Sequence, residues 1–383
     1  MARPDRHIPL DAEKNTANAF SVTPKALAGR TALRLPRWLL KLLIMIVGLL
    51  VFILALLLLK QGAKVYGGAI ISYLHISSAV NSLGFGWLLA YIFLSGSPVA
   101  AIAVSFFAAG TITATQAFTM ITGSRLGASF IVLFVGFVYY LRGHQRAASI
   151  SIGVLALLTT AAIYLPALAI GYWLLTSGVL RSLQVSATTP ISSLIDPAFD
   201  PILGLIKQLG LPGWAIFGLG IGTLLLGFNL LDRALPEMNA ERSSFQHIGR
   251  LVYRPVAMFL LGCAVTSLTL SVSVSLSILV PLSAKGLVRR ENTLPYIMGA
   301  NITTFIDTLV AALINGGPAA FTIVLVEMIS VATLSLLVLA FCYRPFERAI
   351  LRLQEIVIRD NRTLGAFLGI MLIIPVILLL VKS

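Results

Sequence analysis

The chain has 383 residues, of which 58% are hydrophobic and only 11% are charged, and its mean hydropathy is +0.96. A soluble chain carries roughly a quarter charged residues, so this composition excludes an array of soluble domains and indicates a polytopic membrane protein. The 28 Lys and Arg outnumber the 14 Asp and Glu and give a net charge of +14. In a membrane protein such an excess favours basic loops at a cytoplasmic face over a nucleic-acid partner.

The N-terminal part divides into an arm and a first span. Residues 1–41 are polar and basic and lack the apolar content of a packed core, so we predict a disordered cytoplasmic arm. The uninterrupted apolar run 42–59 is long enough to cross a bilayer and is interpreted as a span running outward. It opens a first transport repeat that we place over residues 42–177.

Residues 65–141 contain one formal charge, Arg125, and are interrupted at Ser95-Gly96-Ser97-Pro98. A helix ending near Leu94 and a second ending near Ala109 would each be about half a span, which is typical of a re-entrant hairpin. The full spans that follow in this repeat are predicted over 116–141 and 148–176.

An extracytoplasmic loop over 178–212 separates the two halves, and its segment 191–209 has the spacing of a helix that lies on a membrane surface. The second transport repeat is predicted over 213–341. Its apolar stretch 256–284 is broken by Ser271-Val-Ser273-Val-Ser275, which predicts a second hairpin. Full spans are expected over 214–231, 292–313 and 319–341.

The C-terminal part begins with an amphipathic segment. Phe346, Ile350, Leu353 and Val357 share one helix face, which predicts a helix at the inner headgroup layer within a cytoplasmic segment 342–362. An extra C-terminal span, 363–381, lies in the last segment, 363–383.

The expected fold is therefore an all-α polytopic membrane protein with about seven full spans and two re-entrant hairpins. When the basic arm starts in the cytoplasm, most of the positive charge falls in loops on the inner side, at 142–147, 232–254, 285–290 and 344–362. The first hairpin then opens from the outside and the second from the inside, so the two repeats are inverted. We expect the chain in the plasma or inner membrane of the cell.

An internal repeat points to the same architecture, because the halves align without a gap at a constant offset. Inverted repeats with broken hairpins are the architecture of secondary transporters. The alternative is that Ser and Gly only allow membrane helices to pack closely, which explains neither the constant offset nor the opposite hairpin orientations. The matching pairs are Ser95 with Ser271, Ser97 with Ser273, Gly110 with Gly286, and Gly123 with Gly299.

Two motif pairs resemble a known family. Ser95-Gly-Ser97 precedes Gly123-Ser-Arg-Leu-Gly127, and Leu270-Ser-Val-Ser273 precedes Met298-Gly-Ala-Asn-Ile-Thr-Thr304. Over residues 80–140 and 255–340 this pattern resembles the two repeats of the type II sodium/phosphate cotransporters. The resemblance implies sodium-coupled uptake of inorganic phosphate. It also implies that the hairpin serines Ser95, Ser97, Ser271 and Ser273 lie near the anion, and that Asn301, Thr303 and Thr304 lie near the cations.

The chain departs from the family pattern, which has Gln-Ser-Ser-Ser at each hairpin tip and Gly-x-Asn-Ile-Gly-Thr-Thr after it. Leu94 and Leu270 stand where the family has Gln, and Arg125 stands where its first repeat has Asn. Gly96 and Val272 replace the middle serines, and Thr303 replaces a glycine. The chain is therefore interpreted as a divergent member.

The hairpin serines have two interpretations. Broken helices expose backbone N–H groups that favour an anion, and hydroxyls add donors without a fixed charge. A single serine more often bonds back to its own helix. Because they form a symmetric pair of clusters at the two tips, we favour the anion site.

Three formal charges lie deep within spans: Arg125, Asp307 and Glu327. Counted from the outer ends of their helices at 1.5 Å per residue, all three lie about 14 Å below the outer surface, so they can meet. Arg125 then attracts the anion directly, or Asp307 and Glu327 bind sodium or share a proton. A purely structural Arg–carboxylate pair is the third possibility.

The predicted function is a secondary active transporter that carries inorganic phosphate or a similar anion by sodium symport and alternating access. A proton-coupled anion transporter and a non-transporting regulatory or assembly protein that kept the fold remain open. An enzyme is not expected, because the serines lack a partner His. The chain has no nucleotide-binding loop and no metal-ligand spacing, so no cofactor and no metal beyond sodium is expected. Its expected partners are the anion, sodium or a proton, and the lipid bilayer.

Overall fold

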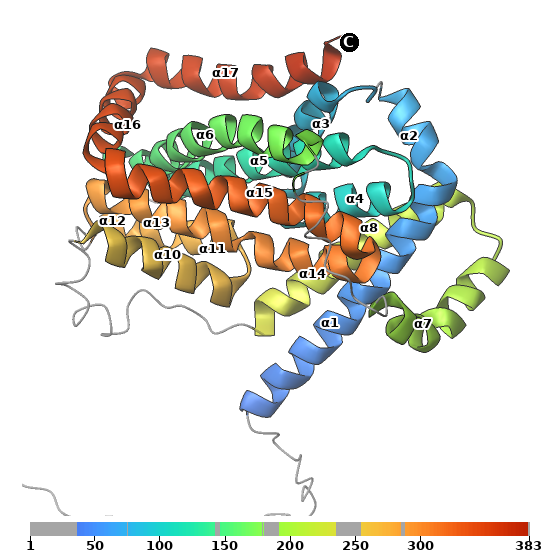
Figure 1. Cartoon of the computed structure of the whole chain (residues 1–383). Coiled ribbons are helices and arrows are strands. Elements are labelled where there is room, and N and C mark those ends of the chain that lie inside the picture. The colour runs from blue at the N-terminus through green and yellow to red at the C-terminus, as the bar shows by residue number, and fades with distance from the viewer. Residues whose placement is uncertain are drawn as a thin grey trace, which may run out of the picture.

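The computed structural model describes residues 37–74, 76–141, 146–177, 179, 191–234, 254–284 and 288–381. Every regular element in these residues is a helix (Figure 1). Seven helical runs in the described part are long and apolar enough to cross a membrane, which confirms the predicted multi-pass architecture. They are Leu39–Tyr73, Ala114–Val138, Ile150–Ser177, Gly213–Ala234, Arg290–Asn315, Gly317–Ile358 and Asn361–Leu380. The predicted arm up to residue 36 and the basic loops 142–145, 235–253 and 285–287 lie outside the described residues.

The first span is longer than predicted at both ends. Helix α1 (Arg37–Gly62) continues through the π-helical η1 (Ala63–Gly67) into α2 (Gly68–Tyr73). It therefore starts within the segment predicted as an arm and passes the predicted end at residue 59. Single lysines do not end an apolar helix, because their long stems can reach a polar partner. Lys60 donates to the carbonyl of Asn315 at 2.9 Å.

Two short helices follow, as predicted for the first hairpin. Helix α3 (Ala79–Phe93) is capped by Ser78 and ends at Leu94, whose φ of 49° is in the left-handed region. Helix α4 (Ser97–Ala108) begins after this break. Two long helices, α5 (Ala114–Leu141) and α6 (Arg146–Ser177), complete the half.

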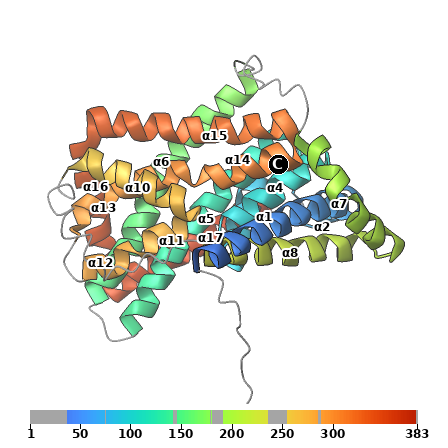
Figure 2. The same cartoon turned by 90° about the horizontal axis from the view of Figure 1, so that it is seen from below.

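The described loop between the halves contains α7 (Ile191–Gln208), the predicted amphipathic helix. Helix α8 (Gly213–Ala234) then runs alongside α1 (Figures 1 and 2). Gly62 allows this close packing, because a Cβ there would lie 2.6 Å from the backbone of Phe217.

The second half repeats the short-helix pattern. Helix α10 (Pro255–Thr269) ends at Leu270, which also has a φ of 49°. The stretch beyond the break was predicted as one helix but forms two, α11 (Val272–Ser277) and α12 (Leu279–Ala284). Pro281 explains the division, because it has no N–H to donate to the carbonyl of Ser277.

The last helices form two bends. The predicted span 292–313 is divided at Thr304 into α13 (Arg290–Thr303) and α14 (Phe305–Asn315). Helix α15 (Gly317–Leu337) passes through the π-helical η3 (Val338–Cys342) into the amphipathic α16 (Tyr343–Ile358). Helix α16 crosses one end of the bundle, and α17 (Asn361–Leu380) returns along its side (Figure 1).

The turn into α17 is closed by Asp360. The backbone N–H groups of Thr363 and Arg362 each donate to its carboxylate at 2.8 Å. These bonds hold the pKa of the Asp360 carboxyl below its ordinary value.

Glycine contacts between helices recur at the offset of the predicted repeat. A Cβ on Gly86 or Gly123 would lie 2.1 Å from a carbonyl oxygen of the facing helix, which joins α3 to α5. A Cβ on Gly262 or Gly299 would likewise lie 2.1 Å from a carbonyl oxygen of the facing helix, so α10 and α13 are in close backbone contact. The four glycines and the carbonyls that they face (Leu83, Met120, Phe259 and Tyr296) correspond pair by pair between the halves.

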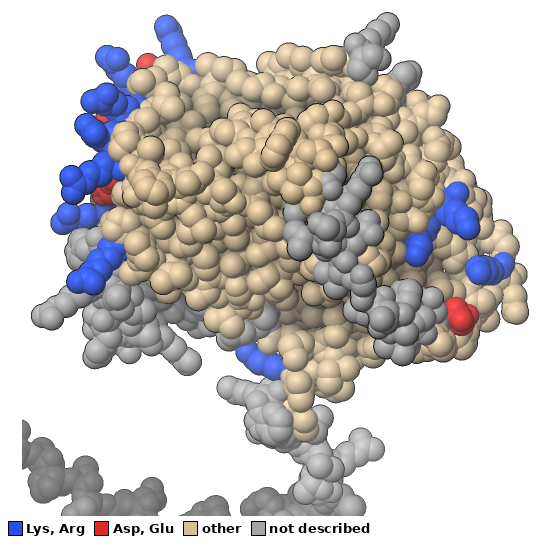
Figure 3. All heavy atoms as spheres, viewed as in Figure 1, with Lys and Arg blue, Asp and Glu red and all other residues tan. Residues whose placement is uncertain are grey.

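On the face of the molecule drawn in Figure 3, charge lies mainly at the two ends of the bundle. Figure 3 shows Lys and Arg gathered at the end that α16 crosses, and fewer at the opposite end near α2 and α7. The broad surface between the ends is nearly free of charge in this view. The described basic residues of α16, its turn into α17 and the start of α13 are Arg289, Arg290, Arg344, Arg348, Arg352, Arg359 and Arg362.

Adding a methyl group at the close helix contacts should destabilise the protein. We expect Gly299→Ala to lower the free energy of unfolding by about 1–3 kcal/mol, because its Cβ would collide with the backbone of Phe259. Gly222→Ala is the matched control, since no atom lies within 4 Å of a Cβ at that position. Thermal unfolding of the purified chain in detergent measures both changes. Equal unfolding temperatures for the two variants would contradict the proposed packing.

Candidate functional site

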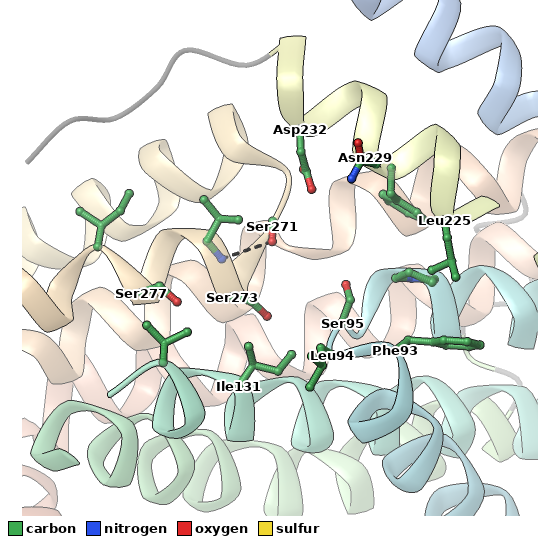
Figure 4. A pocket seen from close by; sticks show the side chains of 15 residues that line it. Phe93, Leu94, Ser95, Ile131, Leu225, Asn229, Asp232, Ser271, Ser273 and Ser277 are labelled. Carbon is green, nitrogen blue, oxygen red and sulfur yellow. Dashed lines mark hydrogen bonds between the residues drawn. The ribbon is translucent and has the colours of Figure 1, made fainter. Parts of the chain in front are cut away.

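The two helix breaks line one cavity of about 690 Å³ (Figure 4). Leu94 and Ser95 come from the first break, and Ser271 and Ser273 come from the second. The opposing wall is formed by α8, and the floor by α5. The other lining residues are Phe93, Pro98, Ile131, Val135, Leu225, Phe228, Asn229, Asp232, Val274, Ser277 and Ile278. Segments far apart in the sequence therefore meet here.

Three of the four hairpin serines face the cavity. Ser273 is 9% exposed, and its Oγ has no hydrogen-bond partner among the described residues. The Oγ of Ser271 accepts from the backbone N–H of Val274 at 3.3 Å, which caps α11. A hydroxyl that accepts still has its own hydrogen to donate, so Ser95, Ser271 and Ser273 all offer donors.

Ser97 faces away from the cavity, toward a buried arginine. Arg125 is 2% exposed, and its Nη1 donates to Ser97 Oγ at 3.5 Å and to Thr304 Oγ1 at 3.2 Å. Its Nη2 donates to Thr308 and lies 3.7 Å from the Oδ1 of Asp307. The guanidinium therefore joins the start of α4, after the first helix break, to α14.

Arg125 and Asp307 form a buried ion pair. Asp307 is 8% exposed, and its Oδ1 also accepts from Thr308 at 2.9 Å. Its Oδ2 has no hydrogen-bond partner among the described residues. The guanidinium also lies over the ring of Phe305 at 4.9 Å. The arginine is thus neutralised by a carboxylate that keeps one oxygen free.

Glu327 is the second deep carboxylate and is 2% exposed. Neither of its oxygens has a hydrogen-bond partner of ordinary geometry in the described part of the chain. Thr122 and Arg125 are polar residues in its neighbourhood. Arg125, Asp307 and Glu327 therefore lie in one region, as their depths indicated.

The residues of the motif after the second helix break bond to protein groups. The Asn301 side-chain amide donates to the hydroxyl of Thr160 at 3.1 Å, and its backbone carbonyl accepts from the hydroxyl of Tyr164 at 2.9 Å. Thr303 donates to the carbonyl of Cys263 at 3.1 Å. Only Thr304, of this group, contacts Arg125. In this conformation Asn301, Thr303 and Thr304 connect α13 and its junction with α14 to α5, α6 and α10.

Two residues that line the cavity, Asn229 and Asp232, were not predicted as site residues. Their positions differ by three, so they share one face of α8. Asp232 was interpreted as the first residue of a charged loop, whereas α8 continues through it to Ala234. The signal in the sequence was an Asn and an Asp at helical spacing at the end of an apolar run.

The lining chemistry suits the binding of a small ion. Its polar groups are hydroxyls, one amide and one carboxylate set among apolar side chains, and none of the described lining residues is His, Lys or Arg. No group of three or more His, Cys, Asp or Glu in the described part of the chain forms a metal-type cluster.

Removing the partner of Arg125 should be costly. We expect Asp307→Ala to lower the free energy of unfolding by about 3–5 kcal/mol, because it leaves a buried charge without a counter-charge. Arg125→Met combined with Asp307→Leu should recover much of that loss. Thermal unfolding in detergent measures each variant, with the exposed Asp200→Ala as the control. A single variant as stable as the wild type would contradict the pairing.

Comparison with known proteins identifies one matching family model. Residues 223–359 match the model described as Na+/Pi-cotransporter. The match extends from α8 to the residue after α16, and it includes the second break, Asp307 and Glu327. It confirms the resemblance noted for residues 255–340 and does not extend to residues 80–140. No match was found among curated proteins or among solved structures.

Proposed function

We propose that this chain carries phosphate by sodium symport, because residues 223–359 match the Na+/Pi-cotransporter family model. The observation that carries the proposal is the cavity where the serines of two helix breaks meet. A site between broken helices is the usual binding site of secondary transporters with repeated halves.

Phosphate would bind among Ser95, Ser271 and Ser273. These hydroxyls supply several donors and no fixed positive charge, which suits an anion that must also be released. Helix α4 begins near Ser95, and the positive end of its dipole adds to the attraction. Ser97 would not contact the anion; its hydroxyl accepts a hydrogen bond from Arg125 and would help to hold the guanidinium in place.

Alternating access would come from the movement of two inverted repeats against each other. The paired glycine contacts at a constant offset support two similar units. The basic end crossed by α16 supports a cytoplasmic side there and, with the positive-inside rule, a cytoplasmic N-terminus. In this arrangement the short helices α3, α4, α10, α11 and α12 form the two re-entrant hairpins.

We assign the coupling of sodium to anion transport to the buried polar residues around Arg125, which lie next to the helix breaks and outside the cavity lining. Asp307 offers a free oxygen, and Asn301, Thr303 and Thr304 lie on the adjoining helix end. Arg125 links Ser97 of one repeat with Thr304, Asp307 and Thr308 of the other. A change at the anion site would therefore reach the ion-coupling residues through this guanidinium.

A proton-coupled anion transporter is the second candidate, and Glu327 favours it. Both oxygens of this buried carboxylate are without a hydrogen-bond partner in the described residues, so it is a group that can take up a proton during the cycle.

Uptake of radiolabelled phosphate into proteoliposomes tests the proposal directly. We expect uptake to be driven by an inward sodium gradient and to be absent when potassium replaces sodium. Uptake driven only by a pH gradient would support proton coupling instead. Absence of uptake under either gradient, with monodisperse folded protein, would contradict transport and favour a non-transporting membrane protein.

The role of Glu327 is tested by Glu327→Gln. If Glu327 takes part in coupling, the variant should lose most of the dependence of uptake on the sodium or pH gradient. Glu355→Gln, an exposed change on α16 with the same loss of charge, should keep it. Unchanged coupling of Glu327→Gln to both gradients would rule out a coupling role for this residue.

The role of Ser273 is tested by Ser273→Ala. Loss of one hydrogen bond to an anion should raise the KM for phosphate about tenfold. Thr322→Ala is the control, because that hydroxyl donates to the carbonyl of Pro318 in its own helix, at 2.9 Å. Equal KM values for Ser273→Ala and the wild type would place the anion elsewhere.

A further inference from the structure

A carboxylate faces the serines across the cavity. Asp232 and Asn229 project from α8 toward the side where Ser271 and Ser95 lie (Figure 4). None of the described residues that line the cavity is Lys or Arg. An anion bound to the serines would therefore meet the negative charge of Asp232 with no positive side chain in the lining to offset it.

The nearest buried cation does not correct this imbalance. Arg125 is already paired with Asp307 at 3.7 Å. Its charge is therefore already balanced within the protein. Asp232 is left without a positive partner among the described lining residues, so this side of the cavity attracts a mobile cation.

We propose that Asp232 and Asn229 of α8, together with Ser271, form a sodium site that bridges α8 to the bound anion. This inference rests on the proposed function and adds two residues to it. A carboxylate, an amide carbonyl and a hydroxyl are oxygen ligands of the kind that hard cations prefer. The spacing of Asn229 and Asp232 puts both on one face of α8.

A second observation points to a ligand in the same cavity. The Oγ of Ser273 is more than nine-tenths buried, faces the cavity and has no hydrogen-bond partner among the described residues. Leaving such a hydroxyl unsatisfied costs free energy. An anion held by Ser273 and by the sodium ion at Asp232 satisfies this hydroxyl and offsets the carboxylate at the same time.

The arrangement has a consequence for the order of binding. The anion site is repulsive until the cation is bound, so sodium binds first and increases the affinity for phosphate. Linkage makes the effect reciprocal, so phosphate increases the affinity for sodium by the same factor.

The test begins with sodium binding to the full-length chain in detergent, without phosphate. Thermal unfolding is followed while NaCl replaces choline chloride at constant ionic strength. We expect sodium to stabilise the wild type and Asp200→Asn equally, because Asp200 lies on the distant α7. Asp232→Asn should bind sodium at least tenfold more weakly, and Asp232→Glu should keep part of the affinity. A wild-type sodium titration for Asp232→Asn, or no response of the wild type to sodium, would overturn the proposal.

Asn229→Ala provides an independent variant if Asp232→Asn does not yield folded protein. It removes one ligand and leaves the charge unchanged, so sodium affinity should fall severalfold. An unchanged affinity for Asn229→Ala would overturn the proposed ligand set.

Phosphate uptake separates this inference from the proposed function. Sodium binding that depends on Asp232 without phosphate uptake would refute phosphate transport and support the cation site. Sodium-driven uptake that is equal in Asp232→Asn and the wild type would support phosphate transport and refute the cation site. In the wild type, added phosphate should also raise the apparent sodium affinity, and in Asp232→Asn it should not.

Discussion

A helix that breaks inside a bilayer exposes backbone groups that lipid cannot hydrogen-bond, so protein must surround the break. This constraint accounts for most of the architecture of the chain. The breaks after α3 and α10 line one cavity, and the glycine contacts of α3 with α5 and of α10 with α13 bring backbone against backbone in both halves. The groups that lipid would leave unsatisfied are thereby gathered at one place, where they can bind an ion.

The same constraint governs the buried charges. Arg125 is tolerated because Asp307, Thr304 and Thr308 surround its guanidinium and Phe305 covers one face of it. The charge of Arg125 is therefore paired within the protein and is not available to offset Asp232, which lines the cavity from α8. In the proposed sodium site, a cation from solution would offset Asp232.

Much of this could be predicted from local sequence. Long apolar runs identified the spans, since only helices satisfy their own backbone in lipid, and Ser-Gly-Ser-Pro interrupted the first half where α3 ends. Counting the rise per residue along each helix predicted that Arg125 and Asp307 lie at the same level and can meet, because that rise is constant. The local sequence did not predict the division of the span 292–313. The apolar run around Thr304 contains no helix-breaking residue, yet the helix divides there, where Thr304 contacts Arg125 of a different helix.

The sequence by itself determined that the chain is a multi-pass helical membrane protein with interruptions near Ser95 and Ser271, because hydropathy and the positions of Ser, Gly and Pro act within a few residues. Only the tertiary structure decided which polar groups share a cavity. Ser95 faces it while Ser97, two residues away, turns to Arg125. Asn229 and Asp232 enter it from α8, whose place opposite the breaks depends on its packing along α1 and not on any pattern within its own sequence.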